Sequence, residues 1–294
     1  MPRLLIAGCG YLGEAVADLF LATQWQVEGW AMSQRSVEEL KFRPARAVDI
    51  SNLDQVRAAA TDFDAVIHAA STRGGGPDSY RRVYLNGLKN LLECFPSSRI
   101  LFASSTSVYA QASGESVTEE SAAEPKTETG KILREAEDIA LVKNGIVIRL
   151  GGIYGPDRSA LLKKFLGGEA VIDPANDRFV NEIHRDDAAA AIQLLLTNTE
   201  TGGEIYNVVD NEPMLLSECY RWLAVKLNRP LPPVGKSIRL RKAPARQASK
   251  GKRGDSNKRV SNAKLRARGW TPRYPNFASG MEKSVLPSFA RELA

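Results

Sequence analysis

The sequence predicts an α/β protein built on a Rossmann-like, doubly wound parallel sheet, with a smaller C-terminal substrate-binding region. Short apolar runs alternate with amphipathic segments through the first half of the chain, as parallel strands alternate with connecting helices. A glycine-rich turn follows the first apolar run directly. In the second half of the chain, strand and helix patterns alternate less regularly. We therefore predict a cofactor-type domain at 1–155, and a mainly substrate-binding region at 156–294 with some segments returning to the first domain.

Each element follows from its local pattern, taken in chain order. Continuous apolar runs predict buried strands at 3–7, 26–31, 45–50, 64–70, 99–103 and 145–150. Apolar residues at helical spacing predict helices between them at 14–22, 53–60, 79–95 and 130–143. The second half predicts helices at 185–197, 216–227 and 261–268, a strand at 205–209 and a loop at 230–255.

Composition narrows the class of protein. A chain of 294 residues with 43% hydrophobic and 25% charged residues is long enough for a well-buried core. No apolar run reaches the length of a membrane span, and no signal-peptide pattern is present, so we expect a cytoplasmic protein without membrane contact. The three cysteines and two histidines are far apart in sequence. That spacing predicts neither a metal site nor a disulfide framework.

The turn at residues 8–13 has the G-x-G-x-x-G pattern of dinucleotide-binding folds. Gly8 permits the tight turn, Gly10 lets backbone N–H groups approach a pyrophosphate, and Gly13 lets the helix pack on the strand. The intervening residues Cys9, Tyr11 and Leu12 complete the loop. The helix N-terminus adds partial positive charge at the same point. The pattern predicts an NAD(P) site, with a purely structural glycine turn as the alternative.

The end of the second strand should select between the two cofactors. NAD-binding proteins place an acid there, but Ala31 holds that position and Glu28 lies too early, inside the strand. Ser33 and Arg35 follow and could receive a 2′-phosphate, so we favour NADP over NAD; alternatively, Arg35 is only a solvated residue. Asp49 could accept a hydrogen bond from the adenine amino group, or could cap the next helix.

Further motifs follow in a characteristic order: Asp49-Ile50, 68–70 (HAA), 104–109 (SSTSVY), 149–156 (RLGGIYGP) and 184–187 (HRDD). Together with the glycine turn, this order resembles the extended short-chain dehydrogenase/reductases, the NAD-dependent epimerase/dehydratase family. The glycine spacing, with Ala7 where the family usually has its first glycine, is similar to that of atypical members. The resemblance implies that Ile50, Ala69, Ala70 and Ser71 also line the cofactor, and that a homodimer forms.

The resemblance implies a catalytic Ser, Tyr and Lys, of which only the serine, Ser105, has a clear match. The family phenol takes or gives a proton, its lysine lowers the pKa of that phenol, and its serine orients the substrate oxygen. The motif alignment puts Thr129 at the Tyr position and Leu133 at the Lys position. A shift of two residues recovers Lys131 but still lacks the tyrosine. We take Ser105, Thr129 and Lys131 as catalytic candidates, although a threonine hydroxyl is a far weaker acid than a phenol.

Substrate contacts are expected from residues near the predicted cleft. Tyr84 replaces a family Asn, whereas Tyr154 and His184 lie in family segments beside the nicotinamide end and the cleft mouth. For those two residues, packing is the alternative. The resemblance implies a small-molecule substrate of the nucleotide-sugar type, whose diphosphate Lys258 or Arg259 could bind. Both belong to a basic segment, 236–268, with thirteen Lys or Arg and one acid. That segment could equally be a solvated loop.

Three functions are compatible with these observations. The first is an NAD(P)-dependent oxidoreductase or nucleotide-sugar-type epimerase whose acid–base group has moved. The second is a non-catalytic NAD(P)-binding sensor or scaffold. The third is a nucleic-acid-associated protein that uses segment 236–268. This function is disfavoured because the segment contains no aromatic residue on which bases could stack.

Overall fold

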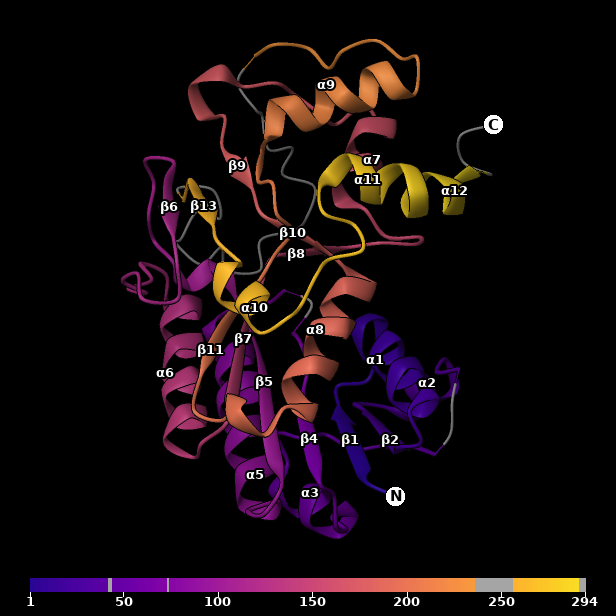
Figure 1. The fold of residues 1–294 in the computed structure, drawn as a ribbon, viewed down its shortest axis with the longest axis vertical. Coiled ribbons are helices and arrows are strands. Elements are labelled where there is room, and N and C mark those ends of the chain that lie inside the picture. The colour runs from indigo at the N-terminus through magenta and orange to yellow at the C-terminus, as the bar shows by residue number, and fades with distance from the viewer. Residues whose placement is uncertain (42–43, 73, 236–255, 291–294) are drawn as a thin grey trace.

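A computed structural model describes residues 1–41, 44–72, 74–235 and 256–290 of the chain. Its centre is a seven-stranded parallel sheet in the order β11-β7-β5-β4-β1-β2-β3 (Figure 1). The strands are β1 (Arg3–Ala7), β2 (Gln26–Ala31), β3 (Ala45–Ala47), β4 (Ala65–His68), β5 (Arg99–Ser105), β7 (Ile146–Leu150) and β11 (Ile205–Val208). The strand order reverses between β1 and β4, and in such sheets ligands bind in the crevice beyond that point.

Helices cover both faces of the sheet because each strand buries side chains on both faces. In β1, Leu4 and Ile6 belong to one core cluster, and Leu5 and Ala7 to the other. The first cluster is covered by α1 (Tyr11–Ala22) and α8 (Arg185–Thr197), which pack against each other. The second is covered by α3 (Leu53–Ala59), α5 (Gly87–Cys94) and α6 (Glu128–Val142). This layered arrangement confirms the predicted doubly wound fold.

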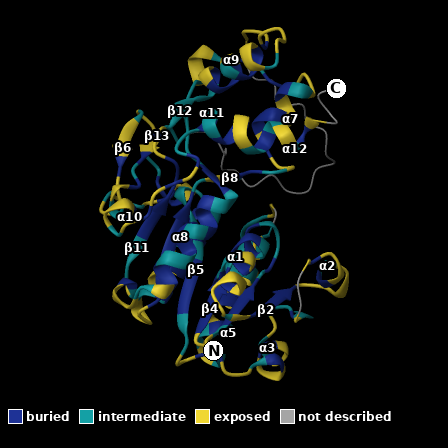
Figure 2. Cartoon of the chain, turned by 45° about the vertical axis from the view of Figure 1, so that its right-hand side comes forward, coloured by how far each residue is buried: buried dark blue, intermediate teal, exposed yellow. Residues whose placement is uncertain are grey.

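A smaller lobe with its own core lies beyond the carboxyl ends of the strands (Figure 1). Its helices are α7 (Ala160–Leu166), α9 (Leu216–Lys226), α11 (Phe277–Gly280), η5 (Met281–Val285) and α12 (Leu286–Ser288). Two short strand pairs, β8 (Gly152–Tyr154) with β10 (Glu182–His184) and β9 (Phe179–Val180) with β12 (Met214–Leu215), connect it to the sheet. Figure 2 shows buried residues on the inner sides of both lobes. The division at residue 155 stays a prediction.

One long-range strand pairing brings a late segment of the chain to the loop at the carboxyl end of β5. β6 (Glu115–Val117), in the loop after β5, pairs in parallel with β13 (Lys258–Val260). The short helix α10 (Ala263–Ala267) follows and packs near β11. Of the basic segment 236–268, residues 236–255 lie outside the described part of the chain.

The main elements lie where the sequence predicts them, with local differences. β3 ends at Ala47 rather than at residue 50, because Asp49 starts a turn in which its carbonyl accepts from the Asn52 N–H. The helix predicted at 79–95 is α4 (Pro77–Tyr80), a π-helical turn η1 (Arg81–Asn86) and α5. The small-lobe elements α7, α11 and α12 were not predicted. In the part of the chain that the structure describes, no helix combines the length and apolarity needed to span a bilayer.

Candidate cofactor and active site

The glycine turn at the end of β1 is held by its backbone against two neighbouring strands. The N–H groups of Gly8 and Cys9 both donate to the Trp30 carbonyl at the end of β2. Gly8 has φ +94°, and a Cβ there would overlap the backbone of Ala69 and Ala70, which follow β4. Only glycine satisfies both constraints. The turn therefore sits at the crevice where the sheet order reverses.

The same turn leaves room for a ligand at the start of α1. Gly10 is the N-cap of α1, no side chain caps that helix, and a Cβ on Gly10 would meet no atom within 4 Å. Gly13 and Leu12, in contrast, face the protein interior. Free helical N–H groups beside open space suit a pyrophosphate. This chain's own geometry therefore fits a dinucleotide. Burial raises the pKa of the Cys9 thiol to about 12, so that thiol stays protonated.

Tyr11 links the glycine turn to the segment that follows β8. Its hydroxyl donates to the Pro156 carbonyl at 3.0 Å. The guanidinium groups of Arg158 and Arg185 each lie 4.9 Å from the centre of its ring. Burial raises the pKa of Tyr11 to about 12, while the two arginines oppose that effect. Neither arginine was predicted, because contacts between residues so far apart in sequence leave no local pattern.

Ser33 and Arg35 lie just beyond β2, where the adenosine end is expected. Ser33 caps α2 (Gln34–Glu38) by accepting from the Ser36 N–H. The Arg35 side chain is 89% exposed and pairs with Glu39 at 3.4 Å. Glu28 is buried within β2 and pairs with Arg46. The polar surface after β2 is thus free of acids until Glu38.

Asp49 lies beyond β3 and has a carboxylate oriented by its neighbour. Its Oδ1 accepts from both the N–H and the hydroxyl of Ser51. The cap of α3 is Asn52, whose side chain accepts from the Gln55 N–H. The alternative that Asp49 caps α3 is therefore wrong. Ile50 is buried, and its carbonyl accepts from the Asn90 side chain.

The end of β4 carries two alanines and an aromatic cluster. The Ala69 N–H donates to the Ala7 carbonyl, which places the Ala69–Ser71 backbone beside the glycine turn. His68 is fully buried, its Nε2 contacts the Val83 carbonyl at 3.0 Å, and burial lowers its pKa to about 4. Its ring stacks on Tyr84, which is half-buried on the turn η1. His68 is thus a neutral residue that fixes the turn carrying Tyr84.

Ser105 and Ser104 differ in accessibility at the end of β5. Ser105 is half-buried, and its Oγ accepts from the Ser107 N–H, capping the 3₁₀ turn η2 (Thr106–Val108). Ser104 is buried and donates to Glu137 of α6 at 2.6 Å. Of these two serines, only Ser105 is exposed enough to present its hydroxyl at the carboxyl edge of the sheet.

A buried ion pair fills the space between β5, β7 and α6. Arg149 of β7 donates to both carboxylate oxygens of Glu137, with a shortest distance of 2.7 Å. It also donates to the Tyr109 hydroxyl at 2.8 Å. Tyr109 in turn contacts the side chain of Asn207. These charges are satisfied by one another, which is the condition for stable burial.

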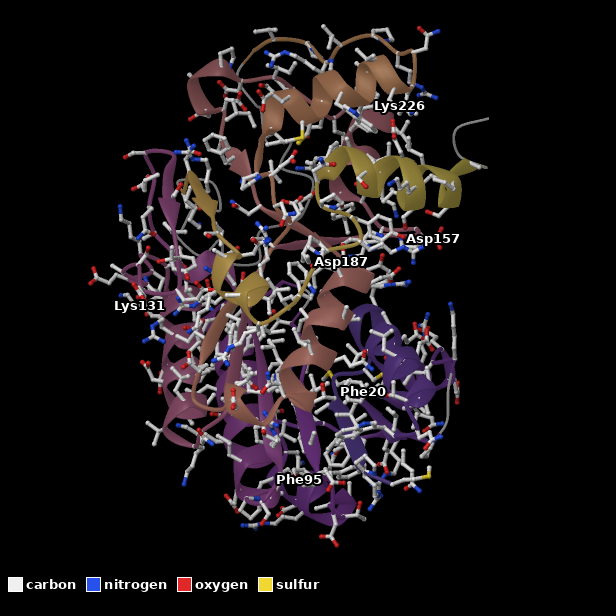
Figure 3. All side chains as sticks on the ribbon, viewed as in Figure 1. Phe20, Phe95, Lys131, Asp157, Asp187 and Lys226 are labelled. Atoms are coloured by element: carbon white, nitrogen blue, oxygen red, sulfur yellow. The ribbon has the colours of Figure 1, made fainter. Side chains whose placement is uncertain are left out.

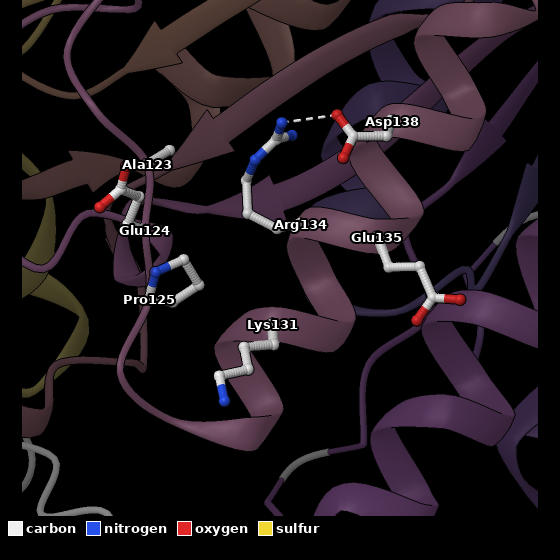
Figure 4. A pocket seen from close by; sticks show the side chains of 7 residues that line it. All are labelled: Ala123, Glu124, Pro125, Lys131, Arg134, Glu135 and Asp138. Atoms are coloured by element: carbon white, nitrogen blue, oxygen red, sulfur yellow. Dashed lines mark hydrogen bonds and ion pairs between the residues drawn. The ribbon is translucent and has the colours of Figure 1, made fainter.

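Thr129 and Lys131 lie on different sides of α6. Thr129 is half-buried, next to the N-cap Thr127. Lys131 is more than half exposed and pairs with Glu128 at 2.7 Å. Because Lys131 is two residues from the buried Leu133, about 200° round the helix, it points away from the sheet. Figure 3 shows it across the molecule from α1, which carries Phe20, and Figure 4 shows it in a pocket on the outer face. This position argues against a catalytic role for Lys131.

Tyr154 and His184 are packed between the sheet and the small lobe. His184 caps α8 by accepting from the Asp186 N–H at Nδ1, and its Nε2 contacts the Ser284 hydroxyl at 2.9 Å. Burial lowers the pKa of His184 to about 4. Tyr154 is 1% exposed, and burial raises the pKa of its phenol. These observations favour the packing interpretation of both residues over substrate contact.

Lys258 and Arg259 point to opposite sides of β13. Lys258 is 5% exposed and its Nζ donates to the Tyr109 carbonyl at 2.9 Å. Arg259 is exposed, donates to the Gly114 carbonyl and lies over the ring of Phe179. The structure therefore separates two residues that were predicted together.

Two carboxyl groups, of the half-buried Glu182 and the buried Asp210, lie close enough to Tyr154 to affect its pKa. Burial raises the pKa of Glu182 to about 8, and burial with the charge of Glu182 raises the pKa of Asp210 to about 8. Among the described residues, Oε2 of Glu182 and the Tyr154 hydroxyl have no hydrogen-bond partner. The pair therefore favours the protonated state near neutral pH.

The fold and the glycine turn together define a Rossmann-like protein of the short-chain dehydrogenase/reductase type. The family described as NAD dependent epimerase/dehydratase matches residues 4–208. The chain belongs to this family. Protein YeeZ of Escherichia coli K12 is 33% identical over 224 residues, which cover 71% of this chain and 77% of that protein. The 2-alkyl-3-oxoalkanoate reductase of Shewanella oneidensis is 25% identical over 239 residues, covering 71% and 62%.

Solved structures share the fold over nearly the whole chain. UDP-glucose 4-epimerase of Thermotoga maritima, solved with UDP-glucose, has a TM-score of 0.82 at 16% identity and covers 99% of this chain and 100% of its own. UDP-glucuronic acid 4-epimerase of Bacillus cereus, in complex with NAD, has a TM-score of 0.79 at 17% identity, with coverage of 99% and 100%. At these identities, the likeness concerns the fold alone.

Proposed function

We propose that this protein is a nicotinamide-dependent oxidoreductase that acts on an oxygen-bearing carbon of a small substrate of the nucleotide-sugar type. The observation that carries the proposal is the uncapped start of α1, where Gly10 faces open space. Backbone groups from Gly8 to Gly13 would hold the pyrophosphate. Asp49 and Ile50 would line the adenosine end, and Ala69, Ala70 and Ser71 the path toward the nicotinamide.

NADP is the cofactor that the residues after β2 favour, although the cofactor in the Bacillus cereus structure is NAD. Ser33 and Arg35 offer a hydroxyl and a cation, and no acid stands there to accept ribose hydroxyls and repel a 2′-phosphate. Arg35 would exchange its exposed partner Glu39 for the 2′-phosphate. A phosphate offers a charge-assisted and bidentate partner for a guanidinium.

When bound, the nicotinamide supplies or accepts a hydride. In the proposed reaction, Ser105 donates a hydrogen bond to the substrate oxygen and orients it at the end of β5. Thr129 could add a second hydroxyl, but a neutral alcohol is too weak an acid to move a proton at neutral pH. The proposed substrate contacts are Tyr84, which is partly exposed, and Arg259, which is exposed.

Fluorescence titration with NADPH and NADH tests the binding half of the proposal. Wild type should bind, and Gly10→Ala should weaken binding at least tenfold with an unchanged melting temperature, because the added Cβ meets no protein atom but enters the pyrophosphate space. Gly76→Ala is the matched control, since Gly76 also precedes a helix and has open space around its Cβ. Equal affinity of Gly10→Ala and wild type would contradict the site.

The non-catalytic alternative is distinguished by turnover. It is favoured by the burial of Leu133 at the position where the family resemblance implies a lysine. Binding of NADPH without its oxidation, against a panel of carbonyl compounds and UDP-sugars, would support a sensor. Oxidation that falls at least tenfold in Ser105→Ala would support the enzyme. Nucleic-acid binding through segment 236–268 predicts a gel shift at low salt that disappears as salt rises.

A further inference from the structure

Two arginines from later segments of the chain lie against the ring of Tyr11, the residue that follows Gly10 in the glycine turn. The guanidinium carbons of Arg158 and Arg185 are each 4.9 Å from the centre of that ring. The distance between the two guanidinium carbons therefore cannot exceed twice that value. Arg158 follows β8 and Arg185 begins α8, so cations from two different segments converge on the start of α1.

The turn that ends at Arg158 packs closely against Tyr11. Gly155 and Arg158 exchange backbone hydrogen bonds of 2.9 and 3.0 Å, which close the turn. A Cβ on Gly155 would lie 2.7 Å from the Tyr11 hydroxyl and 3.3 Å from the Cβ of Arg185, so a side chain at this position would displace that hydroxyl. The Tyr11 hydroxyl itself donates to the Pro156 carbonyl at 3.0 Å. Glycine therefore allows the turn to reach both Tyr11 and the start of α8.

The same turn is also held by the small lobe. The backbone N–H of Asp157 donates to the Ser288 hydroxyl of α12 at 2.8 Å. Asp157 has φ +59°, in the left-handed region that residues other than glycine adopt infrequently. Figure 3 shows Asp157 between the small lobe and the helices α1 and α8. Because the turn is held from two sides, the point at which the Arg158 side chain leaves the backbone is fixed.

Most N–H donors of these two guanidinium groups have no acceptor in the part of the chain that the structure describes. Arg185 donates through Nε to Asp186 at 2.9 Å, and its two terminal nitrogens contact no acceptor among the described residues. Arg158 is exposed, and its guanidinium forms no hydrogen bond or ion pair with those residues. The buried Arg149, in contrast, is occupied by Glu137 and a phenol. Donors left over on two neighbouring guanidinium groups suit an anion with several oxygens.

The electrostatic potential at the start of α1 is positive. Burial raises the pKa of the Tyr11 phenol to about 12. Among the charges around that phenol, the two arginines lower its pKa more than the two carboxylates, of Asp157 and Asp186, raise it. The uncapped N–H groups of α1 add partial positive charge beside Gly10, where a Cβ would meet no atom within 4 Å. Geometry and charge therefore favour an anion at this point.

We propose that Arg158 and Arg185 form a phosphate clamp, which holds the pyrophosphate of the dinucleotide together with the backbone of the glycine turn. The clamp rests on the proposed function, which places the dinucleotide at that turn. A guanidinium can donate to two phosphoryl oxygens at once, and two guanidinium groups offset both negative charges of the pyrophosphate. The ring of Tyr11 positions the two side chains through cation–π contacts.

Binding measurements on two single variants test the clamp without any turnover. Arg158→Met and Arg185→Met keep a long side chain and remove the charge. We expect each to weaken NADPH binding, followed by fluorescence, and ADP binding, followed by competition with NADPH, about tenfold, because both ligands carry the pyrophosphate. Arg229→Met is the matched control: Arg229 is exposed just beyond α9, forms no ion pair among the described residues, and should change both affinities less than about twofold.

The salt dependence of NADPH binding separates a charge contact from a structural role. Screening by salt weakens a charge–charge contact, so the affinity of wild type should fall more steeply with ionic strength than that of Arg158→Met or Arg185→Met. If the two arginines only held the small lobe against Tyr11, the variants would lose melting temperature instead, and their salt dependence would match that of wild type. That second pattern would overturn the clamp.

Further ligands distinguish failure of the clamp from failure of the proposed function. NADPH and ADP affinities that stay unchanged in both variants, while UDP-glucose binding falls, would assign the arginines to a substrate diphosphate and overturn the clamp. A wild type that binds neither NADPH nor NADH would contradict the proposed function. Inorganic pyrophosphate then decides on the anion site: a rise in melting temperature that Arg158→Met abolishes would support it, and no rise in wild type would overturn it.

Discussion

The carboxyl edge of the central sheet has two halves, one at the glycine turn (8–13) and one at α6. These halves use polar groups in opposite ways. At the glycine turn, Gly10 and the start of α1 leave backbone N–H groups uncapped beside open space. At α6, Glu137, Arg149 and Ser104 satisfy one another in a buried network. Uncapped donors beside open space indicate a ligand, whereas mutually satisfied charges indicate a structural role. Glu137, Arg149 and Ser104 are therefore held by one another, and no ligand is needed to account for their burial.

The largest expected effect comes from breaking the buried ion pair. Glu137→Leu would leave Arg149 buried without a counter-charge, and loss of one partner of such a pair typically costs about 3–5 kcal/mol in the free energy of unfolding. Urea denaturation measures the loss. Glu135→Leu is the control on the same helix, because Glu135 is 47% exposed and should change stability by about 0.5 kcal/mol or less. Equal effects of the two substitutions would show that the network is not structural.

A smaller effect on the free energy of unfolding is expected from Glu182 and Asp210. Their pKa values, raised to about 8, lie above those of unfolded Glu and Asp, so the folded state holds protons that the unfolded state has released. The stability they contribute is present at low pH and is lost as the pH rises toward 8. One proton exchanged over 1.5 pH units corresponds to about 2 kcal/mol.

Between pH 6.5 and pH 8, the effect of Glu182 and Asp210 on stability can be measured apart from that of the histidines and Lys258. His68 and His184, whose pKa values are lowered to about 4, contribute stability that is complete above about pH 6.5 and is lost only below it. Lys258 affects stability only above pH 8. Thermal melts of wild type should therefore show a lower melting temperature at pH 8 than at pH 6.5. Glu182→Gln should flatten that slope, and an unchanged slope would contradict the assignment.

Local sequence patterns explain why the glycine turn could be predicted, whereas the residues that reach it from later in the chain could not. Gly8, Gly10 and Gly13 lie within one strand, turn and helix, so their spacing in sequence carries the prediction, although Gly8 also contacts the segments that end β2 and follow β4. Arg158 and Arg185 reach Tyr11 only because the chain returns to the glycine turn. That return depends on tertiary packing, which leaves no local periodicity.

Lys258 shows the same limit from the opposite direction. In sequence it stands in a basic run, and a solvated loop was one interpretation of that run. The pairing of β13 with β6 turns alternate residues to opposite sides, so Lys258 is buried while Arg259 is exposed. The pairing joins residues more than a hundred positions apart. The resemblance to the family could place Ser105, but it could not show that Lys258 would be buried and Arg259 exposed.

The smallest expected effect is a change in the preference between NADPH and NADH, at the half of the carboxyl edge that holds the glycine turn. Arg35 has an 89% exposed side chain and only the i+4 partner Glu39, an interaction of a few tenths of a kcal/mol. Its replacement should therefore leave folding unchanged. If the guanidinium receives a 2′-phosphate, Arg35→Ala should weaken NADPH binding about tenfold, or about 1.4 kcal/mol, and NADH binding less than twofold. The ratio of the two dissociation constants, measured at fixed ionic strength, isolates the phosphate contact, because all other contacts are common to both cofactors. An unchanged ratio would mean that Arg35 is a solvated residue and that the preference for NADP has no basis at this position.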